Sequence, residues 1–585
     1  MRHLIDPQQN LLFDPAEAMF SPMALRYLTE DWPGLFRSQL LHVMPAKELA
    51  ERFHPVLGTR TKELYSMAGV IFLKEYFDLN IDQTVYHYVV DPCWQYALNV
   101  NPATASLGHA SVERYTKYFR EDDLAQKIFD SVTSALINIL ELDISRQRLD
   151  STHIYSDMAT FGRTKLMGVT IKRFLKQLKR YDKDLFAQLK EDFRKRYAVS
   201  ESKLFGDHKG TRQQLRQLAA EDLLYLVSTF AEHSKVTGWT TYKALKRVLE
   251  EQCDVQEERV TVKGKTGGNV MQNPSDPDAS YDGHKGPGYQ AQISETCSET
   301  NDAQLITGVA VEPAHCSDQD AIEPMLDQLE DNDRQPELLF TDTGYSSDEN
   351  VEAAAQKGVD LQTPVAGAPT GNDTDLTIDD FVIDENTNVV QRCPAGHEPL
   401  SSQYDSQEDK TVTEMDSGCC TSCDFCDQCP VKKVRDHYIV THTPAQHRIA
   451  SRRAEQSTEA FVENYSIRGG GESVNSGLKR KTGMGRLRVR GRPNMKLGVL
   501  LRCAGWNLSR AVAALKKRGI ANFGGLLDHL LGLLRYFGYV QCSGKVNRAN
   551  RATFLYAPFG FTHSRWGGLI TVSYTHLTLP TTPYV

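Results

Sequence analysis

The sequence predicts an α/β protein with large helical parts. Between residues 289 and 364, short apolar runs typical of strands alternate with helical runs, which indicates a sheet covered by helices. In residues 1–140 and 168–253, apolar residues recur at spacings of three and four, as in amphipathic helices. The composition, 40% hydrophobic and 24% charged, is that of a globular protein and excludes a wholly disordered chain of 585 residues.

Residues 1–140 are expected to form a helical N-terminal domain. The helical spacing is clearest in Thr61–Phe77 and Ser111–Leu140, and Asp91-Pro92 and Asn101-Pro102 mark turns between helices. Short helices with tight turns are compatible with a helix-turn-helix DNA-binding unit. They are equally compatible with a helical packing or dimerisation domain, so both interpretations stay open.

A weak strand and a helical insertion are expected next. The β-branched residues between Asp143 and Tyr155 indicate the strand, and helical patterning returns over residues 168–253, within an insertion expected at 161–257. The segment Arg163–Arg196 carries 12 Lys/Arg against four Asp/Glu. Such a run is compatible with a solvated helix face or with a face that contacts DNA.

The remaining α/β core is expected to follow a loop at residues 255–290, which is rich in Gly, Pro and Asp. The expected elements, in order, are strands at Tyr289–Ser294 and Leu305–Val311, a helix at Ala321–Glu330, a strand at Glu337–Asp342, a helix at Val351–Lys357 and a strand at Val359–Pro364. Near the end of the chain, Met495–Arg518 has the pattern of a long amphipathic helix.

Charge is strongly segregated, although the net charge is only −8. The segment Lys479–Arg518 holds 13 Lys/Arg and no Asp or Glu, whereas Asp318–Glu385 holds 19 Asp/Glu and two basic residues. The basic block indicates a polyanionic partner, and nucleic acid is the commonest one. A solvated face, or a local salt-bridge partner for the acidic block, is the alternative.

The sequence favours a cytoplasmic protein without a membrane partner. Its most apolar stretch, Gly524–Val540, is interrupted by Asp528, His529 and Arg535, and the N-terminus lacks the pattern of a signal peptide.

Three acidic residues occur in settings that indicate a catalytic site. Asp150 lies in LDST at the end of the weak strand, Asp342 lies in LLFTDTGYSS at the end of a clear one, and Glu472 lies in YSIRGGGESVNSGLK. Carboxylates at the ends of neighbouring strands meet at one sheet edge. A third carboxylate from a helix would complete a set of oxygen ligands for Mg²⁺. Two such ions activate an attacking oxygen and stabilise the leaving one in phosphodiester displacement.

The third setting is the most specific. Tyr465, Arg468, Glu472 and Lys479 follow the spacing Tyr-x2-Arg-x3-Glu-x6-Lys, which places the last three on one face of a helix. The three glycines Gly469–Gly471 oppose a simple helix, because each costs about 1 kcal/mol relative to alanine. We therefore expect either a helix that starts near Gly471 or close packing of this backbone against DNA.

These motifs resemble the YREK signature of DDE transposases from bacterial insertion sequences. Asp150 and Asp342 look like the first two catalytic acids of that family, and residues 1–140 resemble the InsH-type N-terminal domain. The segment GRPNMKLGVLLRCAGWNLSR, residues 491–510, is similar to the one that follows the catalytic Glu. The resemblance covers residues 40–515.

The resemblance implies an RNase H-like mixed sheet interrupted by insertions. It implies a Mg²⁺-dependent triad of Asp150, Asp342 and Glu472 that binds two ions, for which Mn²⁺ substitutes, and that cleaves and transfers DNA strands. Tyr465, Arg468 and Lys479, with Arg480 and Lys481, would bind DNA. The partners would be the terminal inverted repeats and target DNA, bound by a homodimer associated with the bacterial nucleoid. An inactive or domesticated DNA-binding derivative, and a structural zinc-binding interaction protein, remain alternatives.

Six of the 12 cysteines fall between Cys393 and Cys429, which favours a local metal site over a disulfide framework. Structural Zn²⁺ bound by Cys393, Cys423, Cys426 and Cys429 is the leading hypothesis. An iron–sulfur cluster or no metal at all are the alternatives.

The predicted domain order follows from these patterns. The N-terminal domain spans residues 1–140, the catalytic core 141–160 and 258–385, the helical insertion 161–257, the Cys-rich zinc-ribbon-like insertion 386–440, the catalytic Glu helix with the basic part of the core 441–520, and a C-terminal tail 521–571. Val572–Thr582 back-translates to a transposon-end sequencing adapter, so residues 572–585 are expected to be an artefact.

Overall fold

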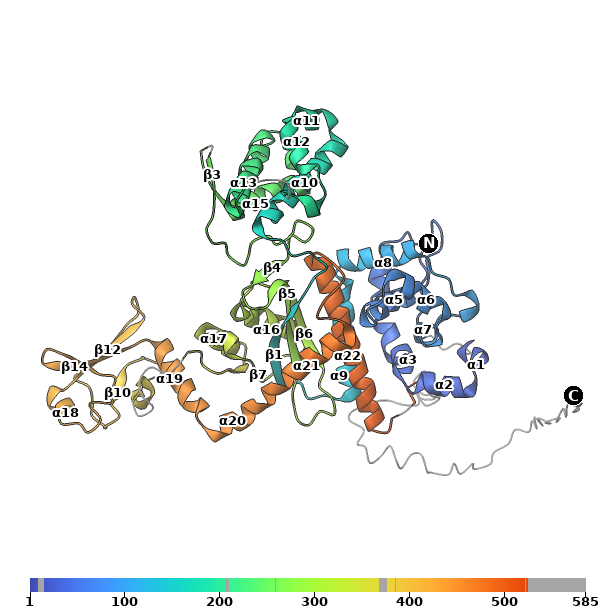
Figure 1. The fold of residues 1–585 in the computed structure, drawn as a ribbon. Helices are drawn as coiled ribbons and strands as arrows, with labels where there is room; N and C mark the ends of the chain where they lie inside the picture. The colour runs from blue at the N-terminus through green and yellow to red at the C-terminus, as the bar shows by residue number, and fades with distance from the viewer. Residues whose placement is uncertain are drawn as a thin grey trace, which may run out of the picture. The chain divides into compact units, whose positions relative to one another are not determined.

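The structure is a computed structural model that describes residues 1–8, 15–205, 210–257, 259–367, 376–384, 386–520 and 522–523 (Figure 1). Apart from residues 522 and 523, the predicted C-terminal tail 521–571 lies outside the described residues. The suspected adapter segment 572–585 lies entirely outside them.

Residues 15–140 form helices, as the apolar spacing predicts. They are α1 (Pro15–Met19), α2 (Pro22–Thr29), α3 (Trp32–Leu35), α4 (Ala46–Ala50), α5 (Leu64–Tyr76), α6 (Ile81–Val90), α7 (Pro92–Ala97), α8 (His109–Glu121) and α9 (Leu124–Leu140). The two Pro-containing turns are confirmed, because Asp91 caps α7 and Asn101 caps a short 3-10 helix with their side chains. Helices α5 and α9 pack against α22 (Arg492–Lys517), which gives this region a packing role.

A mixed six-stranded sheet forms the centre of the α/β part, which confirms the predicted α/β class. Its strands are β1 (Arg146–Ile154), β4 (Ser280–Asp282), β5 (Gly286–Thr296), β6 (Ile306–Pro313), β7 (Leu338–Phe340) and β8 (Asp360–Gln362). The order is β4-β5-β1-β7-β8, with β6 also paired to β5. Strands β1, β7 and β8 are parallel, and the other pairings are antiparallel.

Side chains of the sheet enter two hydrophobic cores. One core joins Ile154 of β1 and Ile293 of β5 to α22, α9 and α5. The other joins Leu149 of β1 and Leu339 of β7 to α16 (Ile322–Asp331) and α17 (Asp348–Gln356). Since successive strand residues point to opposite faces, the sheet is covered by helices on both sides.

The region between β1 and β4 has a hydrophobic core of its own. Its helices are α10 (Arg163–Tyr181), α11 (Lys183–Gln188), α12 (Glu191–Tyr197), α13 (Arg212–Thr229), α14 (Ser234–Thr237) and α15 (Thr240–Gln252). The predicted loop at 255–290 is wrong in part, because β2 (Cys253–Gln256) and β3 (Arg259–Val262) pair and β4 follows. Alternating valines stabilise this hairpin, since Val260 is buried against α13 and α15.

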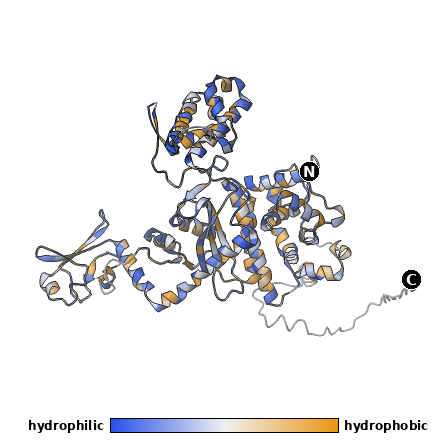
Figure 2. Cartoon of the chain, viewed as in Figure 1, coloured by the Kyte–Doolittle hydropathy of each residue, from blue (hydrophilic) through white to orange (hydrophobic). Residues whose placement is uncertain are grey.

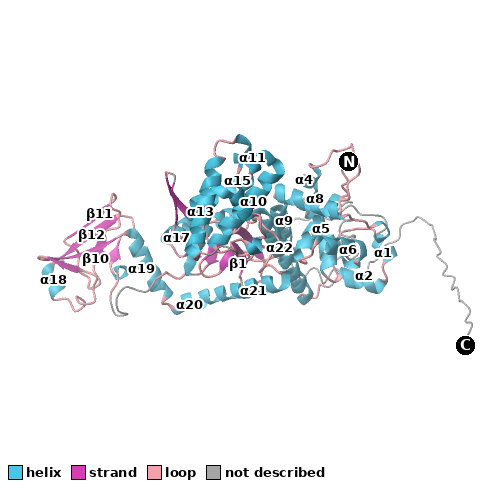
Figure 3. Cartoon of the chain, turned by 45° about the horizontal axis from the view of Figure 1, so that its top comes forward, coloured by secondary structure: helices cyan, strands magenta, loops and turns pink. Residues whose placement is uncertain are grey.

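Strands gather again in the Cys-rich module, residues 376–442 (Figure 3). The module contains β9 (Val382–Ile383), β10 (Val390–Arg392), β11 (Ser401–Asp405), β12 (Lys410–Met415), α18 (Ser417–Thr421), β13 (Lys432–Val434) and β14 (His437–His442). These strands form a four-stranded antiparallel sheet, β11-β12-β14-β13, and a separate β9–β10 pair.

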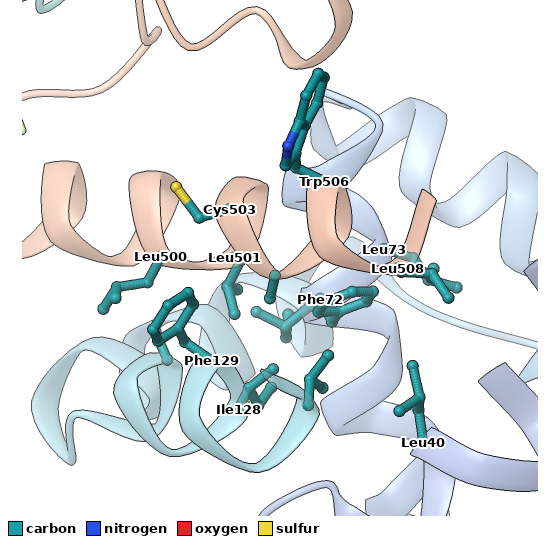
Figure 4. Close-up of a cluster of buried hydrophobic side chains, with 14 of the residues drawn as sticks. Leu40, Phe72, Leu73, Ile128, Phe129, Leu500, Leu501, Cys503, Trp506 and Leu508 are labelled. Carbon is teal, nitrogen blue, oxygen red and sulfur yellow. The ribbon is translucent and has the colours of Figure 1, made fainter. Parts of the chain in front are cut away.

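The chain then runs through α19 (Pro444–Gln456), α20 (Glu459–Tyr465), a 3-10 turn at Ser466–Gly469, α21 (Gly470–Thr482) and α22. In α22 the predicted apolar face is confirmed, and Leu500, Leu501 and Leu508 pack with Phe72 of α5 and Phe129 of α9 (Figure 4). Its Asn507 is fully buried and bonds both backbone groups of Ile306 in β6 (2.8 Å each). Helix α22 thereby joins the sheet to the N-terminal helices.

Hydrophobic and hydrophilic residues both occur along the helices (Figure 2). Among the described residues, none of the helices has the length and hydrophobicity that crossing a bilayer requires.

The packing of α22 predicts the cost of truncating its core. Leu501 is fully buried, so Leu501→Ala should lower the free energy of unfolding by about 2–5 kcal/mol, through lost burial and a residual cavity. Lys517→Ala, on an exposed turn of the same helix, should change it by less than about 0.5 kcal/mol. Urea unfolding monitored by circular dichroism measures both. Equal unfolding midpoints for the two variants would contradict this role of α22.

Candidate active site

Asp150 and Asp342 lie beside each other because β1 and β7 run parallel. Arg148 of β1 is paired with Phe340 of β7, so two residues further along both chains the two aspartates are opposite one another. The expectation that Asp150 ends its strand is wrong, because β1 continues to Ile154 by pairing with β5. Strand β7 ends at Phe340, so Asp342 lies just beyond the end of β7, beside a residue in the middle of β1.

Arg468 connects the two aspartates. Its Nη2 lies 3.3 Å from Oδ2 of Asp342 and 3.6 Å from Oδ1 of Asp150. The guanidinium comes from the 3-10 turn before α21, so Arg468 is outside the α-helix in which the sequence pattern places it. A cation between two carboxylates offsets their mutual repulsion.

The Asp150 carboxylate is partly buried and has several partners. Burial raises the pKa of Asp150; Arg468 lowers it, and the negative charges of Asp342 and Asp318 raise it. Its Oδ2 accepts a hydrogen bond from Nδ2 of Asn475 (3.0 Å), one turn along α21 from Gly471. Asn475 is a contact that the sequence pattern does not indicate.

Asp318 is a further carboxylate that the sequence analysis missed. It accepts hydrogen bonds from Ser151 (Oγ to Oδ2, 3.2 Å) and from Gln292 (Nε2 to Oδ1, 2.8 Å). Gln292 is fully buried and also accepts from the Tyr345 hydroxyl (2.5 Å). Asp318 is one of many acids in an acidic block, and only the tertiary fold brings it next to Asp150.

Glycine allows α21 to approach β1. A Cβ on Gly470 would lie 2.0 Å from Nη1 of Arg148, whereas one on Gly471 would lie 3.8 Å from Asp150. Arg148 is itself held in place, because Nε donates to the buried Glu295 (3.0 Å) and Nη1 donates to the Ile467 carbonyl (2.8 Å). The helix α21 starts at Gly470, within the triple glycine. The close contact expected for this backbone is made with Arg148 of the same chain, whereas the sequence suggested DNA.

A second glycine of α21 lies against α22. A Cβ on Gly477 would fall 2.4 Å from the indole of Trp506. Gly470 and Gly477 are seven residues apart and therefore lie on one helix face. That face fixes α21 between β1 and α22.

Glu472 follows Gly471 in the first turn of α21 and is exposed. Within the described part of the chain, its carboxylate forms no hydrogen bond or ion pair. The fold therefore brings together Asp150 and Asp342, and it carries Glu472 on the helix that packs against them, without a direct contact.

The remaining residues of the motif surround the aspartates. Tyr465 is half-buried, and its hydroxyl donates to the carbonyl of Thr341, which precedes Asp342 (2.8 Å). Burial lowers the pKa of Lys479; the charge of Lys285 lowers it further, and Asp150 acts in the opposite direction. Arg480 and Lys481 are exposed in the last turn of α21.

In the described part of the chain, some residues of the basic block Lys479–Arg518 form ion pairs and others do not. Six of its members pair with acids outside the acidic block, so a salt bridge between the two blocks is not formed among the described residues; these six are Arg488, Arg490, Lys496, Arg502, Lys516 and Arg518. Lys479, Arg480, Lys481 and Arg486 make no ion pair with described residues. Their uncompensated charge is available to an anion.

The carboxylates near Arg468 are of the kind that binds Mg²⁺, but they are not arranged as a metal site. Carboxylate oxygens are the ligands of Mg²⁺; Asp150 and Asp342 flank Arg468, and Asp318 accepts a hydrogen bond from Ser151, the residue after Asp150. Among the described residues, however, no group of three or more His, Cys, Asp or Glu side chains has the arrangement that holds a metal ion. Here Arg468 supplies positive charge between the aspartates.

The predicted zinc ligands lie in one place. Cys393, Cys423, Cys426 and Cys429 line a single cavity together with Cys419 and Cys420. All cysteines in the described part of the chain are free of disulfides.

Comparison with protein families gives one match. Residues 392–512 match the family model described as Transposase DDE domain. The match includes Glu472 and the other residues of its motif, begins beside Cys393, and supports a DDE transposase. Asp150 and Asp342 lie outside the matched range. No curated protein and no solved structure gave a match.

The contact at Gly470 predicts the effect of a single methyl group. Gly470→Ala should destabilise the packing of α21 on β1 by about 1–3 kcal/mol, because the guanidinium of Arg148 would have to move and weaken its bonds to Glu295 and to the Ile467 carbonyl. Gly469→Ala is the matched control, since nothing lies within 4 Å of its Cβ position and its φ is −55°. Thermal unfolding and the rate of proteolysis within residues 459–482 measure both variants. If Gly470→Ala and Gly469→Ala are equally stable, the contact between Gly470 and Arg148 does not determine how α21 packs on β1.

Proposed function

We propose that this protein is a DNA transposase of a bacterial insertion sequence that uses Asp150, Asp342 and Glu472 for metal-dependent cleavage and strand transfer. One observation carries the proposal: Asp150 of β1 lies next to Asp342, which follows the parallel strand β7, and α21, which packs on β1, bears Glu472 within the range that matches a transposase DDE domain. A sheet of four strands in antiparallel pairings, continued by two parallel ones, with helices on both faces, supports an RNase H-like core.

The carboxylates of Asp150 and Asp342 would hold the divalent ions, Mg²⁺ or Mn²⁺. Glu472 would complete the set after a rotation of its side chain toward the aspartates. Bound there, the ions would lower the pKa of a water molecule and stabilise the leaving oxygen. The role of the protein is to fix the acids on a rigid sheet edge and to position the scissile phosphate.

The chemistry would proceed in two displacements. Water attacks the phosphorus at the element end, the P–O3′ bond breaks, and the 3′ oxygen leaves as a hydroxyl after taking a proton. This 3′-OH then attacks a target phosphodiester in line, forming a new P–O bond and releasing the target's own 3′ oxygen. The reaction exchanges one phosphodiester for another, so it requires no ATP.

Arg468 has a second role in this proposal. Its guanidinium neutralises Asp150 and Asp342 before metal and DNA bind, and a guanidinium binds phosphate oxygens as well as carboxylates. The unpaired Lys479, Arg480, Lys481 and Arg486 would bind the DNA backbone near the cut. Tyr465 would help to position Asp342, because its hydroxyl donates to the carbonyl of the preceding residue, Thr341.

The DNA partners would be the terminal inverted repeats and the target, bound by a homodimer at the bacterial nucleoid in the cytoplasm. Residues 1–140 would serve as the InsH-like domain, with the helix-turn-helix role as a part of the proposal. The Cys-rich module and the 161–257 helices would be insertions into the core.

A DNA-binding derivative without catalysis is the second candidate. The observation that favours it is the exposed Glu472, which makes no contact with the aspartates. DNA binding that is sensitive to salt, without cleavage in either Mg²⁺ or Mn²⁺, would select this candidate.

Replacing Asp342 tests the triad. Asp342→Asn should reduce Mg²⁺-dependent nicking of inverted-repeat DNA at least about 100-fold, because the amide cannot supply the negative charge that the ions require. Asp360→Asn is the control, since Asp360 is an exposed acid at the start of the adjacent strand β8. Nicking of a supercoiled plasmid carrying the repeats gives the rates. If Asp342→Asn cuts as fast as the parent, the triad assignment is wrong.

Replacing Asp318 tests whether this carboxylate strengthens the metal site. Asp318→Asn keeps a hydrogen-bond acceptor but removes a charge beside Asp150, so the Mg²⁺ concentration for half-maximal nicking should rise about 10-fold. The rate at saturating Mg²⁺ should stay near that of the parent. Asp320→Asn, an exposed neighbour, should change neither value. An unchanged Mg²⁺ requirement in Asp318→Asn would exclude this role.

A further inference from the structure

The Cys-rich module, residues 376–442, has very little hydrophobic core. Its cluster of buried apolar side chains consists of Phe381, Val390 and Val440, and Cys393 and Cys429 pack against it. Helix α18 has no buried residue, and neither has β13. A unit of this size with so small a core needs a covalent or metal crosslink to stay folded.

The cysteines lie where such a crosslink would act. Two segments that are distant in sequence, the CPAGH loop (Cys393–His397) and the segment Cys419–Cys429, face each other across one cavity of about 20 Å³. This volume holds one water-sized particle. Disulfides do not provide the crosslink, because every cysteine in the described part of the chain is a free thiol.

The backbone of the CPAGH loop holds the sulfur of its one cysteine, Cys393, in place. The backbone N–H of His397 donates to Sγ of Cys393 (3.3 Å), and the N–H of Cys393 donates to the His397 carbonyl (2.9 Å). The loop closes through Gly396, whose φ of +86° favours glycine. An N–H donor directed at sulfur stabilises its anion, and outer contacts of this kind orient metal ligands.

We propose that the module binds one structural Zn²⁺ through Cys393, Cys423, Cys426 and Cys429, and that this ion connects its two halves. Four thiols would each lose a proton as the four Zn–S bonds form, at about 2.3 Å and in tetrahedral geometry. The thiols surround the cavity without forming a preset group of three, so their χ1 angles rotate on binding. The proposal does not depend on the transposase function.

The choice of variants follows from the positions of the thiols. Cys420 lines the same cavity from α18 and could replace a neighbour within the Cys423–Cys429 run. Cys393 is alone in its loop, so no other cysteine can replace it. Cys316 is the control, because it is a free thiol that does not line this cavity.

Metal content of the full chain is the primary test. The protein purified from zinc-supplemented cells should contain about one Zn per chain by elemental analysis, with Cys316→Ser at the same level. Cys393→Ser should contain several-fold less. A zinc-free parent, iron with absorption near 400 nm, or unchanged zinc in Cys393→Ser would each overturn the proposal.

A second measurement does not require the variant to fold. In the unmodified full chain, Co²⁺ exchanged for Zn²⁺ should give the thiolate charge-transfer and visible bands of a tetrahedral sulfur site. Removing the metal with a chelator should accelerate proteolysis within residues 376–442 several-fold, and added Zn²⁺ should reverse this. Octahedral cobalt spectra, or proteolysis that ignores the chelator, would contradict the proposed site.

Discussion

The main chain of α21 lies against the guanidinium of Arg148 from β1, so a side chain at residue 470 would require this guanidinium to move. The guanidinium of Arg148 fills the space where a methyl group would be, and it bonds the turn that leads into the helix. Because Arg148 and Asp150 are two residues apart on one strand, they present the same face to α21. Arg468, Asn475 and Glu472 are all positioned by this one contact, together with the matching close contact of Gly477 with Trp506.

Charge balance is the second constraint on this region. Asp150 and Asp342 lie on either side of Arg468, and burial together with the charges of Asp342 and Asp318 raises the pKa of Asp150. Arg468 counteracts this at the cost of occupying the space between two carboxylates. Divalent cations would take over the same neutralising role, and the released guanidinium would then face the phosphates. Metal binding and DNA binding are therefore expected to be coupled.

Local sequence pattern predicted the elements but only part of the site. The helical periodicity of residues 495–518 predicted α22, and the apolar run before Asp342 predicted β7. Both predictions are correct because the spacing of apolar residues reflects which face of an element is buried. The juxtaposition of Asp150 and Asp342 followed from strand ends meeting at one edge, although Asp150 proved to be mid-strand.

Contacts between residues that are distant in sequence could not be predicted from the local pattern. Asp318 is one acid among many in its block, and Asn475 has no distinguishing neighbours, so nothing local marks either as a partner of Asp150. The triple glycine was visible as an anomaly, but the guanidinium that contacts its middle residue, Gly470, belongs to Arg148, more than 300 residues away in sequence. The hairpin at 253–262 was hidden by its polar and Gly-rich surroundings.

The central claim is that the acids at this sheet edge bind divalent ions against a DNA strand. Anomalous diffraction from crystals of the full chain with an inverted-repeat duplex and Mn²⁺ tests it most directly. The account predicts manganese peaks within about 2.5 Å of the carboxylates of Asp150 and Asp342, with Arg468 moved onto a phosphate. Manganese located elsewhere, with Arg468 still between the two aspartates and DNA bound, would contradict it.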